Sequence, residues 1–116
     1  MSRRGSLAIV IAAAGSAVGA STATGAEVLS GPVSSAGAVE RSCLDQRLTS
    51  GEGYVQRTVT ATGPGSVTAR LAGDGSGDWD VAVFAAGTDR LIAGSAYGGA
   101  SEIAAGYVTG ATELVV

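Results

Sequence analysis

Short β-prone segments alternate with glycine-rich turns from residue 54 to the end of the chain. In the segment 66–71, polar and apolar side chains alternate at every position, which is the period of a strand with one buried face. The first two predicted strands are expected to pair as a hairpin across residues 63–65. The spacing is typical of an all-β domain, here a small antiparallel β-sandwich of the jelly-roll type. We predict six strands, over residues 54–62, 66–71, 79–85, 91–96, 103–108 and 112–116.

Composition supports this fold class and limits what the chain can bind. Of its 116 residues 19 are glycine, and valine, alanine, threonine and serine make up much of the rest. This mixture is too apolar for a disordered chain and too rich in glycine and β-branched residues for a helical bundle. A chain of this length forms one domain at most. Its net charge of −3 argues against a nucleic-acid or anionic-membrane surface.

The first 26 residues have the layout of a signal peptide. Arg3 and Arg4 supply the positive charge, residues 7–18 are apolar and rich in alanine, and residues 18–20 are small enough for signal peptidase. A membrane anchor is the alternative, but the apolar run of about 12 residues falls short of the roughly 20 needed to span a bilayer. We therefore expect residues 1–26 to be cleaved and the protein to be secreted, with no membrane attachment afterwards. Loss of the two arginines would change the net charge from −3 to −5.

The remaining chain divides into a lead-in and a folded domain. Residues 27–40 show no sustained period of a strand or a helix, so we expect a flexible lead-in there. Residues 41–116 are expected to form the β-sandwich. The last predicted strand runs to Val116 with no turn or polar tail after it. Either this strand docks at the domain edge or, as we expect, the domain is truncated at its C-terminal end.

An acidic, glycine-rich loop precedes the predicted strand that holds the only tryptophan and the only phenylalanine. Asp74, Asp78 and Asp80 are spaced so that a tight loop would turn several carboxylate oxygens toward one point, as calcium requires. The likeness to an EF-hand is partial, because Ala85 stands where that loop needs its bidentate glutamate. The alternative is a turn in which the aspartates hydrogen-bond their own backbone. For Trp79, a place in the core or at its rim is favoured over a ligand platform.

The chain contains no histidine, which excludes most catalytic sites. No serine, cysteine or zinc site that depends on imidazole can form. A carboxylate pair would still need a substrate groove with aromatic platforms, and five aromatic residues are too few to build both a core and a groove. We therefore expect no enzymatic activity from this chain. Cys43, the only cysteine, is a small buried residue, a free thiol, an intermolecular bridge or half of a pair with a cysteine outside this chain.

Residues 77–84 and 89–96 resemble the core of the bacterial pre-peptidase C-terminal domain, a small secreted β-sandwich that accompanies extracellular peptidases. The shared features are a Gly-Asp-x-Asp loop that opens an apolar strand and a glycine-rich turn that leads to the next strand. The chain is also similar to versions attached to secreted zinc carboxypeptidases. This resemblance implies that Asp78 and Asp80 are the positions most apt to contact calcium, and that Cys43 pairs with a cysteine after the final strand.

We therefore expect a non-catalytic accessory domain of a secreted peptidase or other hydrolase, which acts in folding, attachment or substrate support. Its partner would be the catalytic domain of the parent peptidase or an extracellular polymer. The alternative is a stand-alone secreted carbohydrate-binding or adhesion module, in which Trp79, Tyr97 and Tyr107 line a shallow site. The exposure of Trp79 separates the two, because a sugar-binding platform must face solvent.

Overall fold

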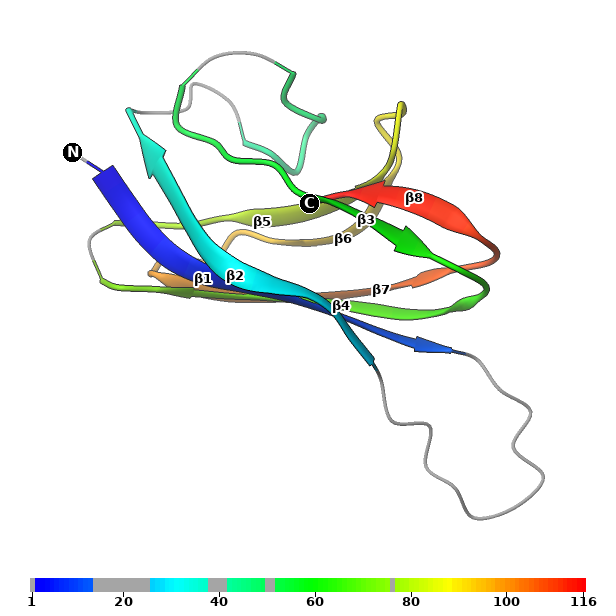
Figure 1. Cartoon of the computed structure of the whole chain (residues 1–116). Coiled ribbons are helices and arrows are strands. Elements are labelled where there is room, and N and C mark those ends of the chain that lie inside the picture. The colour runs from blue at the N-terminus through cyan, green and yellow to red at the C-terminus, as the bar shows by residue number, and fades with distance from the viewer. Residues whose placement is uncertain (1, 14–25, 38–41, 50–51, 76) are drawn as a thin grey trace.

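The chain folds into a β-sandwich of two four-stranded antiparallel sheets (Figure 1). The computed structural model describes residues 2–13, 26–37, 42–49, 52–75 and 77–116. Within these ranges there is no helix, and hence none that is long and apolar enough to cross a membrane. The prediction of an all-β sandwich is confirmed, with eight strands in place of six. The strands are β1 Ser2–Ala13, β2 Ala26–Ala36, β3 Thr58–Ala61, β4 Gly65–Gly73, β5 Val81–Ala85, β6 Leu91–Ser95, β7 Ser101–Val108 and β8 Thr112–Val115.

The strand order shows how the two layers are built. The first sheet has the order β2-β1-β4-β7, and the second has the order β3-β8-β5-β6. Every strand predicted from the sequence is present, as β3 to β8. The two additional strands, β1 and β2, come from residues for which we expected a leader and a flexible lead-in.

One predicted pairing is wrong, because β3 and β4 do not form a hairpin. β3 pairs with β8, whereas β4 pairs with β1 and β7. Val59 on β3 and Val67 on β4 are both buried. Two strands that each have a buried face share one core when they lie in opposing sheets. The turn at residues 63–65 therefore carries the chain from one sheet to the other, while β5 and β6 pair with each other across the turn at 87–89.

The core lies between the two sheets and is mainly aliphatic. β4 contributes Val67, Ala69 and Leu71 from the first sheet, and Val83 and Leu114 face them from the second. Along β4, buried side chains alternate with exposed or half-buried ones, as the period of two predicts.

Residues 42–49 and 52–57 form a covering segment. Its first part lies over the outer face of the second sheet, whereas in its second part Val55 packs against the core and Arg57 pairs with Val116. Leu44 packs against Gly94 on β6, where a Cβ atom would lie 3.0 Å from the leucine Cγ. Arg47 donates two hydrogen bonds to the turn between β5 and β6, at 3.1 and 3.2 Å. Because β5 is covered on both faces, all of its residues are buried.

β1 is an internal strand of the first sheet, between β2 and β4 (Figure 1). It pairs with both neighbours over most of its length and buries Leu7 and Ile9 in the core. Residues 2–13 of the segment that has the layout of a signal peptide therefore form an internal strand in the intact chain. Cleavage of this peptide remains a prediction, and residues 14–25, which include the first predicted cleavage site, lie outside the described residues.

β2 occupies most of the stretch expected to be a flexible lead-in, residues 27–40, so the sandwich does not begin at residue 41. It is an edge strand that pairs with β1, while residues 38–40 lie outside the described part of the chain. Among its described side chains only Val33 and Ser35 are buried. Burial alternates along residues 29–36, but the inward positions include Gly31 and Ser35, so the sequence shows no alternation of apolar and polar residues. The pairing with β1 is what makes this segment a strand.

Candidate functional site

The acidic loop connects β4 to β5 at one end of the sandwich. Backbone hydrogen bonds tie it to the β6–β7 loop: the N–H of Gly73 donates to the Ala100 carbonyl at 2.7 Å, and the N–H of Trp79 donates to the Gly99 carbonyl at 3.0 Å. The Asp78 carboxylate accepts the N–H of Gly99 at 2.6 Å. This bond differs from the local turn considered for the aspartates, since its donor lies 21 residues away in the chain.

Trp79 is buried, with 6% of its surface exposed. Its ring lies against Gly73, where a Cβ atom would come within 2.9 Å of the indole Cδ1. Its Nε1–H is buried and has no hydrogen-bond partner among the described residues. The expectation of a core aromatic is confirmed, and the indole does not form a platform that faces solvent.

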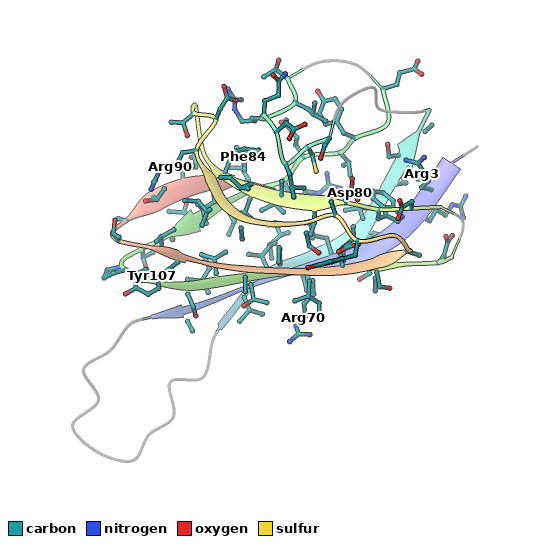
Figure 2. The ribbon with its side chains drawn as sticks, turned by 180° about the vertical axis from the view of Figure 1, so that it is seen from behind. Arg3, Arg70, Asp80, Phe84, Arg90 and Tyr107 are labelled. Carbon is teal, nitrogen blue, oxygen red and sulfur yellow. The ribbon has the colours of Figure 1, made fainter. Side chains whose placement is uncertain are left out.

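Asp80 follows the loop and is exposed to solvent. Partial burial raises the pKa of its carboxyl group, and the negative charges of Asp78 and Glu102 raise it further, whereas the positive charge of Arg3 lowers it. Figure 2 shows Arg3 and Asp80 at the same end of the sandwich. Arg3 also lies against Gly77 of the acidic loop, where a Cβ atom would be 2.7 Å from the arginine Nε. β1 therefore supplies countercharge to the loop.

The structure does not gather the three candidate calcium ligands into one group. Asp74, Asp78 and Asp80 are exposed, and within the described ranges no three acidic or cysteine side chains are placed to hold a metal ion. One oxygen of Asp78 is already bonded to the N–H of Gly99. Calcium binding at this loop remains a prediction.

A pocket of about 120 Å³ lies beside the loop, between the covering segment and the two sheets. Arg3, Cys43 and Asp80 contribute polar or charged groups to its wall. A volume of this size holds a few water molecules or a small apolar group. Sequence reasoning did not find this pocket, because its wall combines strands and a covering segment that are far apart in the chain. Its apolar wall includes Leu7, Val33, Leu71, Trp79, Val81 and Phe84.

Cys43 lines this pocket as a free thiol. Burial raises its pKa to about 11, and the negative charges of Asp80 and Asp45 also act to raise it. At neutral pH the group is therefore a thiol and not a thiolate, so it is neither an activated nucleophile nor a ready metal ligand. Its pairing with a cysteine outside this chain remains a prediction.

Glu102 is a buried carboxyl group on β7, with 3% of its surface exposed. The Ser95 hydroxyl on β6 donates to its Oε2, and its Oε1 has no hydrogen-bond partner in the described part of the chain. It shares the inward face of its strand with Ala104 and Val108, and this period of two is the one sign of its burial in the sequence. The carboxyl group lies in the sandwich interior and does not line the pocket.

Comparison with protein-family models, with curated proteins and with solved structures finds no match to this chain. The resemblance to the pre-peptidase C-terminal domain therefore rests on the sequence pattern of residues 77–96 alone.

Proposed function

We propose that this protein is a non-catalytic accessory β-sandwich domain of a secreted peptidase or related hydrolase. The observation that carries the proposal is that Asp78 and Trp79 both make contacts within the domain. Trp79 is buried, and the carboxylate of Asp78 is hydrogen-bonded to the N–H of Gly99. The most distinctive residues of the sequence thus stabilise the domain and do not form a ligand platform, which favours the accessory role over the carbohydrate-binding alternative.

The chemistry of the remaining groups also supports a role without catalysis. The chain has no histidine to act as a base near neutral pH. Its one cysteine is held as a thiol by a pKa of about 11. Glu102 is enclosed in the core, away from the pocket, so it is out of reach of a substrate.

The alternative, a stand-alone carbohydrate-binding or adhesion module, has less support. Of the three aromatic residues considered for such a site, Trp79 is buried, whereas Tyr97 and Tyr107 are exposed. Tyr97 lies in the loop before β7, whereas Tyr107 lies near the far end of β7 (Figure 2), so the length of a strand separates them. They do not form one platform for a sugar ring.

A fusion experiment tests the accessory role. The full chain is placed ahead of a secreted zinc carboxypeptidase, and the same peptidase that carries only residues 1–26 serves as the reference. We expect N-terminal sequencing to show cleavage within residues 20–26, and we expect the domain to raise the yield or the thermal resistance of the active peptidase. Trp79→Ala should abolish the gain by disrupting the core, whereas Tyr107→Ala, on an exposed residue, should retain it.

Equal yield and equal thermal resistance with and without the domain would contradict the accessory role. Binding of the purified full chain to cellulose or chitin, reduced by Tyr107→Ala, would favour the carbohydrate-binding alternative instead.

A further inference from the structure

β1 is an internal strand whose side chains form part of the core, so the first sheet is incomplete without it. It separates β2 from β4, and among the described strands it is the one that pairs with β2. Ile9 is completely buried, and Leu7 nearly so, which makes both part of the core. Without β1, the first sheet would have a gap of about two strand spacings, roughly 10 Å, between β2 and β4.

Removal of the predicted leader would open this gap. Cleavage at any point in residues 20–26 takes the whole of β1 away, because that strand ends at Ala13. The backbone groups of β4 that face β1 would lose their partners, and the buried side chains next to Ile9 would be exposed. Unpaired internal strand edges bind other strands readily, since main-chain hydrogen bonds and apolar contacts are both available there.

We propose that the place of β1 is a strand-acceptor slot, which in the secreted protein takes an extended strand from the polypeptide of the hydrolase that this domain accompanies. The inference rests on the proposed function, because it requires both cleavage of the leader and an associated hydrolase. The strand that enters runs antiparallel to β4 and to β2, as β1 does in the intact chain.

The contacts of β1 define the chemistry of the strand that fits. Two positions that correspond to Leu7 and Ile9 take large aliphatic side chains, because they face the core. The position of Gly5 takes a small residue, because a Cβ atom added there would lie 3.1 Å from the carbonyl oxygen of Ala72. The position of Arg3 favours a cation, since it lies beside the acidic loop and its charge acts on Asp80. The expected pattern is a cation, a small residue and two aliphatic residues, each two positions after the one before.

A nicked full chain tests the slot directly. A protease site is inserted between residues 20 and 21, the purified protein is cut there, and both fragments are unfolded in urea. They are then refolded by dilution with a fluorescent peptide of residues 2–13 in about tenfold excess. At equal affinity, mass action predicts that about nine-tenths of the 21–116 fragment carries the labelled peptide on size-exclusion chromatography.

Two variant peptides of equal charge provide the matched control. Ile9→Asp places a carboxylate at a fully buried position and should bind about 100-fold more weakly, so that fewer than about one in ten fragments carries it. Ser6→Asp changes an exposed position of the same strand and should exchange nearly as well as the unchanged peptide.

Three results would overturn the inference. The first is equal incorporation of the Ile9→Asp and Ser6→Asp peptides. The second is a 21–116 fragment that unfolds as cooperatively as the intact chain with no peptide bound, and the third is a fragment that closes the gap by pairing with a second copy and excludes the peptide. These outcomes do not depend on the fusion experiment. Equal peptidase yields in that experiment would contradict the accessory role but would not change the result of the peptide exchange.

Discussion

The carboxylate of Asp78 accepts a 2.6 Å hydrogen bond from the backbone N–H of Gly99 and so joins the acidic loop to the loop between β6 and β7. Asp78→Ala removes this bond and should lower the free energy of unfolding by about 1 kcal/mol, because water replaces part of an exposed hydrogen bond. Asp78→Asn keeps an acceptor oxygen and should lose less. Urea unfolding measures both, and an alanine variant as stable as the parent would show that the bond contributes nothing.

Calcium binding is tested on the same loop by thermal unfolding of the full chain in calcium chloride and in a chelator. A ligand that binds only the folded state raises its stability by mass action, so a saturated site should raise Tm by several degrees. The double variant Asp78→Ala, Asp80→Ala and the single variant Asp74→Ala should reduce that shift. The same Tm in calcium and in chelator would show that the loop is a turn held by Gly99 and not a metal site.

The raised pKa of Asp80 predicts a pH-dependent effect on stability. The folded state holds this proton more tightly than the unfolded chain does, so the contribution of Asp80 to stability is present at low pH and is lost as pH rises through the folded pKa. Asp80→Asn should therefore raise Tm at pH 7, by a few degrees at most, and have little effect near pH 3. Glu113→Gln, an exposed change on β8, controls for the loss of one negative charge. A Tm difference that does not vary with pH would contradict this account.

Cys43 should react slowly with iodoacetamide. With a pKa of about 11 in place of 9.0, its thiolate fraction at pH 8 is about 100-fold smaller than that of an unperturbed thiol, and the rate should fall accordingly. Because the charge of Asp80 contributes to this shift, Asp80→Asn should speed the reaction. The folded protein should also lose stability as pH rises from about 9 to about 11, where the unfolded chain releases this proton first. Mass spectrometry follows the alkylation, and a rate equal to that of the unfolded chain would refute the burial of this thiol.

Gly106 on β7 lies so close to β6 that a Cβ atom there would overlap the carbonyl oxygen of Ile92. Gly106→Ala must shift one of the two backbones and should cost roughly 1–3 kcal/mol of unfolding free energy. Gly63→Ala is the matched control, because no atom lies within 4 Å of its Cβ position, and it should change stability by less than about 0.5 kcal/mol. Similar urea midpoints for the two variants would contradict the close approach of β6 and β7.

Much of the secondary structure could be predicted from the sequence, because the period of two is a local property. The strand expected over residues 66–71 is β4, and the burial of Trp79 follows from its place at the head of an apolar strand. The bond from Gly99 to Asp78 could not be predicted, since nothing near either residue in the sequence specifies the other. The same holds for Cys43, whose pKa depends on burial in a pocket that is assembled from distant segments.

The sequence by itself determined the all-β class, the positions of β3 to β8 and the lack of imidazole chemistry, because each of these is read from residue types and their spacing. Only the tertiary structure decided that β3 pairs with β8, that Glu102 is enclosed, and that residues 2–13 of the signal-like N-terminus form an internal strand. Apolar segments such as the one around Ile9 carry the same local pattern whether they are cleaved, span a bilayer or enter a core. Whether such a segment becomes a core strand depends on the free energy that it gains from burial and backbone hydrogen bonds to the rest of the chain. This free energy is set only when all the strands are in place.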